Sequence, residues 1–320
     1  MPRKAMISED REHAKYERLT AATKGMQRLA TAVAYPCDES SLRGALEAAE
    51  AGFIAPILVG PQDKIGSLAQ SLNLDISAAR IVDAPDSQAA AEKAVAIVRA
   101  GEAELLMKGS LHSDELLAAV TRRDTGLRTG RRISHVFVMD VPTHAQTLFI
   151  TDAAVNIAPD LIAKRDIIQN AIDLYAGLGL GTPKVAILSA VETINPSIPS
   201  TIEAAALCKM AERGQITGGE LDGPLAFDNA ISPEAARIKG IKSAVAGHAQ
   251  ILVVPDLEAG NMLAKNLTFL AGADAAGIVL GARVPIILTS RADNVRTRMA
   301  SCAVAMLLAH SRRAREPIRA

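Results

Sequence analysis

Residues 31–60, TAVAYPCDESSLRGALEAAEAGFIAPILVG, contain the pattern that decides the fold. A short apolar run at 31–35 is followed by a helical pattern over 40–52 and by a second apolar run at 56–60. Parallel strands need a crossover connection and are apolar because both of their faces are buried. The stretch therefore predicts a strand, a crossover helix and a second strand of a parallel sheet.

The same alternation continues along the rest of the chain and predicts an α/β protein. Runs 133–139 and 148–151 differ, because they predict two strands joined by a Pro-containing turn, as in a hairpin. The helix at 113–121 is predicted to begin at a Ser113 N-cap with an acidic first turn. The other predicted strands are 81–82, 104–108, 185–188, 251–254, 275–280 and 285–288. One further predicted helix ends near residue 73, and the remaining predicted helices span 87–100, 160–178, 198–213, 259–271 and 291–310.

The length of 320 residues favours two domains, since single cores seldom grow beyond about 250–300 residues. Around residues 121–134 the sequence becomes polar, basic and punctuated by glycine, TRRDTGLRTGRRIS. This segment is the best candidate for a domain boundary.

Composition excludes several classes of partner. The chain has 35 basic and 35 acidic residues, and zero net charge argues against a polyanion-binding surface. Aromatic residues make up 2% of the chain, with no Trp, so platforms that stack nucleic-acid bases are nearly excluded. The sequence therefore predicts no nucleic-acid partner.

The chain carries no sign of membrane insertion or secretion. No run of about 18 uncharged apolar residues occurs, and the N-terminus lacks the apolar stretch of a signal peptide. Cys37, Cys208 and Cys302 lie far apart and match no zinc-ligand spacing. We therefore expect a cytoplasmic protein without a metal site.

General nucleotide-binding and hydrolase motifs are missing. The glycine cluster GLGLG at 177–181 follows a helix and precedes a strand, which is the reverse of a dinucleotide fingerprint. The sequence has no GxxxxGK[ST], GxSxG or HExxH motif. His112, His135 and His144 are interpreted as turn or strand residues and not as metal ligands.

The first candidate for chemistry is MKGSLHS at 107–113, where a predicted strand runs through Gly109 into a helix start. Ligands of α/β sheets bind beyond the carboxyl ends of strands, and a helix N-terminus there offers N–H groups to an anion. Lys108, Gly109, Ser110 and Ser113 would then hold a phosphate group. Equally, Ser113 caps its helix and Ser110 fills a turn, and the spacing does not decide between the two.

The second candidate is PIILTSRADN at 285–294, again a buried strand running into a helix start. Ser290 and Asp293 have the spacing of a capping box. Arg291, however, opposes the positive end of the helix dipole, which favours an anionic ligand. We therefore prefer a binding or catalytic role for this segment over pure capping.

Further polar segments follow predicted strands at 151–160, 195–201, 218–224 and 256–261. Each alone is typical of turns. Together they predict a polar cleft between the two halves of the chain, and Asp152, Asn156 and Asn261 are its candidate binding residues.

Over residues 31–310 the sequence resembles the phosphate acetyl/butyryltransferase family. It also resembles the acyltransferase half of bifunctional enoyl-CoA hydratase/phosphate acetyltransferases, without the hydratase domain. KG at 108–109 and GLRTG at 126–130 resemble the butyryltransferase branch. The other matching strings are LLMKG at 105–109, FITDAAVNIAPD at 149–160, RGQI at 213–216, DGPLA at 222–226, AGN at 259–261 and LTSRAD at 288–293.

The resemblance implies the reaction acyl-CoA + phosphate ⇌ acyl phosphate + CoA, with coenzyme A as a substrate and no tightly bound cofactor. It implies two α/β/α subdomains with a cleft between them, like isocitrate/isopropylmalate dehydrogenases, and a homodimer. The first domain would comprise residues 1–130 plus 281–320, and the second 131–280. Alternatives are a non-catalytic acyl-CoA- or metabolite-binding protein of this fold and a dehydrogenase of this fold that uses NAD and a divalent metal.

The resemblance also assigns catalytic roles. Arg291 would hold the phosphoryl group, Ser290 would hydrogen-bond the reacting thiol or carbonyl, and Asp293 would accept the thiol proton. Full proton transfer from a thiol to an ordinary Asp is uphill by roughly 6 kcal/mol, so we expect positioning and charge stabilisation to carry more of the rate.

A second substrate-binding Arg of the family has no counterpart at 117–119, where this chain has LAA. Arg128 in the GLRTG loop is the candidate replacement. Because few rings are present to stack adenine, Arg128, Arg131 and Arg132, together with aliphatic contacts and loop amides, are expected to hold CoA.

Overall fold

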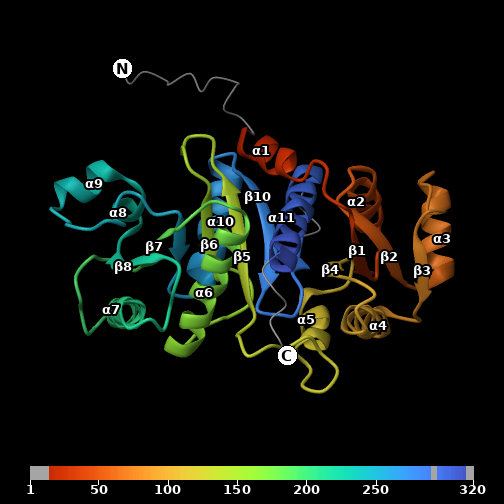
Figure 1. Ribbon diagram of the computed structural model, residues 1–320, viewed down its shortest axis with the longest axis horizontal. Coiled ribbons are helices and arrows are strands. Elements are labelled where there is room, and N and C mark those ends of the chain that lie inside the picture. Colours follow the sequence, from red (N-terminus) through yellow and green to blue (C-terminus); the bar gives the residue numbers. More distant parts are fainter. Residues whose placement is uncertain (1–13, 290–293, 315–320) are drawn as a thin grey trace. The chain divides into compact units, whose positions relative to one another are not determined.

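A computed structural model of the chain describes residues 14–289 and 294–314, and its elements are labelled in Figure 1. The chain divides into two compact units. Unit 1 comprises Met1–Arg18 and Ser134–Ala275, and unit 2 comprises Leu19–Ile133 and Ala276–Ala320. Each unit combines a largely parallel set of strands with helices, so the predicted α/β class is confirmed.

Unit 2 holds strands in the order β3-β2-β1-β4-β11-β10. All neighbours pair in parallel except β10 and β11, which are antiparallel. The strands are β1 (Leu29–Ala34), β2 (Ile54–Gly60), β3 (Arg80–Asp83), β4 (Leu105–Lys108), β10 (Asp274–Leu280) and β11 (Ile286–Ile287). The helices are α2 (Glu39–Glu50), α3 (Gln62–Ser71), α4 (Ser87–Arg99), α5 (Ser113–Thr121) and α11 (Val295–Ala314), and α1 (Ala14–Ala22) crosses the division between the units.

Local sequence explains why unit 2 forms these elements. Asp38 and Asp86 begin α2 and α4 because each carboxylate accepts a hydrogen bond from the backbone N–H three residues later. The strands β1 and β4 are almost completely buried. Helix α11 packs against α2, β4 and β11, and thirteen of its residues are buried, so it is a core helix of this unit.

Unit 1 holds strands in the order β5-β6-β9-β7-β8. The predicted hairpin is confirmed, since β5 and β6 pair antiparallel with Val136 opposite Thr151. The other pairs are parallel. The strands are β5 (Ser134–Asp140), β6 (Leu148–Thr151), β7 (Lys184–Leu188), β8 (Glu220–Leu225) and β9 (Ile251–Val253), and the helices are α6 (Leu161–Gly177), α7 (Pro199–Glu212), α8 (Phe227–Ile231), α9 (Pro233–Ile238) and α10 (Leu257–Leu270).

The polar segment 218–224 predicts a turn, whereas residues 220–225 form strand β8. This strand has β7 as its one neighbour in the order of unit 1. An edge strand is half covered and therefore does not need an apolar run. Its first four residues are exposed or half-buried, which explains why the apolar pattern missed it.

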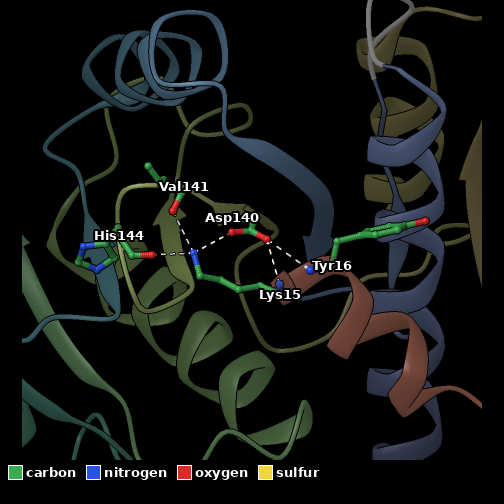
Figure 2. Close-up of polar contacts among 5 residues, drawn as sticks. All are labelled: Lys15, Tyr16, Asp140, Val141 and His144. Carbon is green, nitrogen blue, oxygen red and sulfur yellow. Dashed lines mark hydrogen bonds and ion pairs between the residues drawn. The ribbon is translucent and has the colours of Figure 1, made fainter. Parts of the chain in front are cut away.

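The N-terminal segment differs from the predicted domain assignment, which placed residues 1–18 with 19–130. Residues 14–18 belong to unit 1, because the Lys15 ammonium forms hydrogen bonds with the end of β5 and the β5–β6 connection (Figure 2). Lys15 Nζ donates to Asp140 Oδ1 at 2.7 Å and to the carbonyls of Val141 at 3.0 Å and His144 at 2.8 Å. Asp140 Oδ2 in turn accepts from the backbone N–H groups of Lys15 and Tyr16. The carboxylate thereby caps the first turn of α1 from outside the helix.

Two predicted helix starts are corrected. Helix α5 does begin at Ser113, but its N-cap is His112, whose N–H donates to Glu115 Oε2 at 2.8 Å. Ser113 is therefore the first helical residue and not the cap. Helix α11 begins at Val295 and not at 291, because Asn294 Oδ1 accepts from the Thr297 N–H at 2.8 Å and so supplies the cap.

Candidate active site

The end of β4 carries four of the predicted binding residues, and three of them lie against the end of β1. The N–H groups of Gly109 and Ser110 donate to the carbonyls of Ala34 and Tyr35, each at 2.9 Å. A Cβ on Gly109 would lie 2.3 Å from the Ala34 carbonyl oxygen, so only glycine fits this crossing. Lys108 is buried, and its ammonium donates to the Gly109 carbonyl at 3.2 Å.

Ser110 has a structural role in this arrangement. Its hydroxyl donates to the Tyr35 carbonyl at 2.8 Å and accepts from the Cys37 N–H at 3.2 Å. Ser113 is half-buried one turn further on, in the first turn of α5. The structure therefore brings Lys108, Gly109 and Ser110 together beyond the carboxyl ends of two strands, where α/β proteins bind ligands.

Arg128 lies in an exposed loop beside the segment that follows β10. Its backbone forms a bridge with Ala282, and Leu127 accepts from the Arg283 N–H at 2.9 Å. Thr129 Oγ1 donates to the Gly281 carbonyl at 2.6 Å. The backbone of this loop is thus held firmly, while the Arg128 side chain is exposed.

The predicted catalytic residues Ser290, Arg291 and Asp293 lie outside the described residues. On one side of them, Thr289 follows β11 and is buried. On the other side, Asn294 caps α11. Because this helix already has its cap at Asn294, the capping-box interpretation of Ser290 and Asp293 does not explain where the helix begins.

In unit 1, Asp152 directly follows β6 and is a buried carboxylate that accepts four hydrogen bonds from residues 154–156. Its Oδ1 accepts from the N–H groups of Ala154 at 3.0 Å and Val155 at 3.1 Å. Its Oδ2 accepts from the N–H of Asn156 at 3.2 Å and from the Asn156 side-chain amide at 2.5 Å. The carboxylate folds the 152–156 loop into a tight turn around itself.

Electrostatics at this loop follow from burial. Burial raises the pKa of Asp152, and the N–H groups that surround its carboxylate oppose that rise. His135, on the neighbouring strand, is completely buried, which lowers its pKa to about 3, so the ring is neutral. Its Nδ1 has no hydrogen-bond partner among the described residues.

Asn261 reaches the same loop from α10. Its side-chain amide donates to the Ala153 carbonyl at 3.3 Å, and Gly260 beside it allows close approach, because a Cβ there would lie 3.0 Å from the Ala153 Cβ. Asp152, Asn156 and Asn261 therefore form one polar cluster in unit 1. Lys108, Gly109 and Ser110 form a second cluster in unit 2.

Sequence reasoning missed Arg298, in the first turn of α11. Its residue surface is 9% exposed, and its Nε has no hydrogen-bond partner among the described residues. A signal was present in VRTR at 295–298, which places two arginines and no acid at the positive end of a helix.

No metal site emerges from the described ranges, which contain no group of three or more His, Cys, Asp or Glu side chains able to share an ion. Within the same ranges, no helix has the length and apolar character needed to cross a bilayer.

A family model described as phosphate acetyl/butaryl transferase matches residues 86–306, which is more than half of the chain. The chain belongs to this family. The predicted resemblance is therefore confirmed, and the chain is an acyltransferase of the phosphate acetyl/butyryltransferase type. A non-catalytic role is not favoured.

Named relatives and a solved structure agree with this assignment. A phosphate acetyltransferase of Rhizobium meliloti is 72% identical over 300 residues, covering 94% of this chain and 95% of the relative. A phosphate butyryltransferase of Clostridium acetobutylicum is 43% identical over 287 residues, covering 90% and 95%. The crystal structure of a branched-chain phosphotransacylase from Enterococcus faecalis V583 is similar with a TM-score of 0.78 and 30% identity, covering 88% of this chain and 99% of that one.

The expected likeness to dehydrogenases extends to the fold alone. A putative 4-hydroxythreonine-4-phosphate dehydrogenase from Salmonella typhimurium has a TM-score of 0.53 at 12% identity, covering 88% of this chain and 99% of that one. The fold of the transferase family is thus shared with a dehydrogenase.

Proposed function

We propose that this family member is a phosphate acetyltransferase, acetyl-CoA + phosphate ⇌ acetyl phosphate + CoA. The observation that carries the choice of acyl group is the 72% identity with the Rhizobium meliloti phosphate acetyltransferase. The phosphate butyryltransferases of Clostridium acetobutylicum and Clostridium beijerinckii are 43% and 42% identical. The acyl pocket of an acetyl-specific enzyme would be closed to longer chains by sterics.

The proposed catalytic group is Ser290, Arg291 and Asp293. Arg291 would hold the phosphoryl oxygens, because a guanidinium presents a fork that matches them. Ser290 would hydrogen-bond the reacting thiol or carbonyl. Asp293 would take the thiol proton as the thiolate attacks acetyl phosphate, or return it to the leaving sulfur in the other direction. The Asn294 cap supports this role, because it leaves Asp293 without a capping duty.

The proposed binding residues fall in the two polar clusters and their surroundings. Lys108, Gly109, Ser110 and Ser113 lie at the carboxyl end of β4 and the start of α5, which supports binding of an anionic group there. Arg128 would meet CoA from its exposed loop. Asn156 and Asn261 would offer polar groups around Ala153, and Asp152 would act by holding that loop in shape.

Coenzyme A is the substrate that the family uses, and we propose that no cofactor is tightly bound. We further propose a homodimer in the cytoplasm. Support for self-association comes from α10, where Met262, Phe269 and Leu270 are 60%, 77% and 84% exposed, since large exposed apolar side chains on one helix are typical of interfaces. Three unpaired cysteines are typical of a reducing compartment.

Release of CoA thiol from acetyl-, propionyl- and butyryl-CoA, each with and without inorganic phosphate, tests the proposal. We expect phosphate-dependent release with kcat/KM for acetyl-CoA above that for butyryl-CoA by at least about tenfold, the discrimination that one or two methylene groups provide. Faster turnover of butyryl-CoA would contradict the choice of acyl group. Release that ignores phosphate would contradict the transferase reaction itself.

A further inference from the structure

Arg298 is a largely buried cation that forms no ion pair with any of the described residues. The residue is 9% exposed, and Nε is covered and has no hydrogen-bond partner among the described residues, whereas the two terminal guanidinium nitrogens are not among such covered atoms. Its side chain makes no hydrogen bond or ion pair with any residue in the ranges 14–289 and 294–314. Arginines are rarely buried without a partner, because removing an unpaired charge from water is costly.

Helix geometry directs this side chain toward the start of α11. Side chains of a helix lean toward its N-terminus, and Arg298 lies in the first turn, directly after the segment that follows β11. Helix α11 packs against β4 and β11, and these two strands run in parallel. By this tendency the Arg298 side chain would lean toward the edge of the sheet where β4 ends at Lys108, and its Cδ and Nε lie beside Gly44 in α2.

Helix α2 leaves room for this arginine. A Cβ on Gly44 would lie 2.8 Å from Arg298 Cδ and 2.9 Å from Nε. Glu47, three residues beyond Gly44, has a buried carboxylate oxygen of its own that finds no partner among the described residues. No salt bridge joins Glu47 to Arg298. The space beside Gly44 therefore accommodates the Arg298 side chain, and the described residues around it form no ion pair with its charge.

Among the described residues, the start of α11 offers no anion either. The first turn of α11 has no acidic residue, and both Arg296 and Arg298 oppose the positive end of the helix dipole. Four residues on, burial raises the pKa of the Cys302 thiol to about 12, and the charge of Arg298 acts against that rise. An anion bound at the start of the helix would make the positions of both arginines favourable.

We propose that Arg298 binds a phosphoryl oxyanion of the substrates at the N-terminus of α11. This inference rests on the proposed function, in which such groups occur on phosphate, on acetyl phosphate and on CoA. The bound anion would then pair with Arg298, which has no acidic partner among the described residues.

Replacing Arg298 with Met tests the proposal without relying on turnover. Met has similar length and no charge, so the Arg298→Met protein should unfold at the same or a higher temperature in phosphate-free buffer. Inorganic phosphate should raise the Tm of the wild type and leave that of the variant unchanged. In the kinetic assay, the KM for phosphate should rise about tenfold to hundredfold, as expected when a charged hydrogen-bonding group is removed.

Two further variants sharpen the result. Arg298→Lys keeps the charge and loses the fork, so its KM for phosphate should lie between those of wild type and Arg298→Met. Arg313→Met removes an arginine from the other end of α11, where it pairs with Glu104. That control should keep the wild-type response to phosphate.

Titration with CoA identifies the source of the oxyanion. Loss of the phosphate response, with CoA-induced stabilisation retained, assigns Arg298 to the free phosphoryl group. Loss of the CoA response alone assigns it to a CoA phosphate. A variant that is destabilised or fails to fold in phosphate-free buffer, or that keeps both ligand responses, overturns the proposal. If the wild type binds phosphate but transfers no acetyl group, the proposed function fails while the binding role of Arg298 stands.

Discussion

Lys15 in unit 1 and Arg298 in unit 2 are both largely buried cations, but the described residues around them differ in the partners that they offer. The Lys15 side chain is 11% exposed and finds three acceptors, Asp140 Oδ1 and two carbonyls (Figure 2). Arg298 is 9% exposed as a residue and finds none among the described residues.

This difference distinguishes a buried charge that stabilises the fold from one that we propose binds a ligand. A buried charge whose hydrogen bonds are complete stabilises the segment that it joins, and its loss leaves the partner charge exposed to an apolar environment. A buried charge without partners is destabilising in the free protein. Because Arg298 has no partner among the described residues, we propose that a bound anion completes it.

The largest effect is expected at Lys15. Replacing Lys15 with Met removes the ammonium and leaves Asp140 as a buried carboxylate, whose residue surface is 8% exposed. We expect the free energy of unfolding to fall by about 3 kcal/mol, the cost of breaking a buried pair, measured by urea denaturation. Lys209→Met is the matched control, because its pair with Glu212 is more than half exposed and should contribute at most about 1 kcal/mol. Equal losses in the two variants would break the comparison.

The segment before α11 tests whether catalysis and capping are separate. Asp293→Asn should lower kcat by about 10²-fold or more, the usual contribution of a general base, with little change in stability. Asn294→Ala is the matched variant, since it removes the observed cap and should cost about 1 kcal/mol of stability. Near-normal turnover by a folded Asp293→Asn enzyme would refute the proposed base.

Asp152 is a buried anion that, like the Lys15 cation, has several hydrogen-bond partners, so its replacement should also lower stability. Asp152→Asn places an amide against the N–H groups of Asn156, so we expect a loss of about 2 kcal/mol in urea unfolding. Asp256→Asn is the control, because Asp256 caps α10 by accepting from the Ala259 N–H and Asn is an equally good cap. A loss at Asp256 as large as at Asp152 would show that the four hydrogen bonds are not the cause.

His135 is a buried residue that lacks a hydrogen-bond partner among the described residues at one ring nitrogen but, unlike Arg298, carries no charge. Its Nδ1 also lacks a partner among the described residues, but the folded-state pKa of about 3 lies below the unfolded value near 6.5. Between these values the unfolded chain binds a proton that the folded chain does not, so stability falls as pH falls. We expect His135 to contribute about 1.4 kcal/mol per pH unit, and His135→Leu should flatten the slope of unfolding free energy between pH 5.5 and 4.5 by that amount. An unchanged slope would contradict the buried neutral ring.

Apolar runs predicted most of the fold because its central strands are buried on both faces. Elements without such a run were missed. Strand β8 is a polar edge strand, and α8 and α9 span five and six residues, too few to show a helical period. The assignment of residues 14–18 to unit 1 rests on Lys15 reaching residues more than 120 positions away, which no local pattern reveals.

The candidate site was predictable where chemistry coincides with a short motif. KGS at 108–110 and SRAD at 290–293 follow strands and were found in that way. Arg298 was not found, because an arginine within a helical pattern is normally exposed. Its burial depends on Gly44, which lies 254 positions earlier in the chain and whose missing side chain leaves space for the guanidinium. Sequence spacing also cannot show whether a buried arginine such as Arg298 has an acidic partner.

Thermal unfolding of Lys15→Met and Arg298→Met beside the wild type, each with and without inorganic phosphate, tests the central claim most directly. Without phosphate, Tm should fall for Lys15→Met and should stay level or rise for Arg298→Met. With phosphate, Lys15→Met should show the wild-type increase in Tm, and Arg298→Met should show none. A lower Tm for Arg298→Met without phosphate, together with a wild-type increase when phosphate is added, would contradict the account.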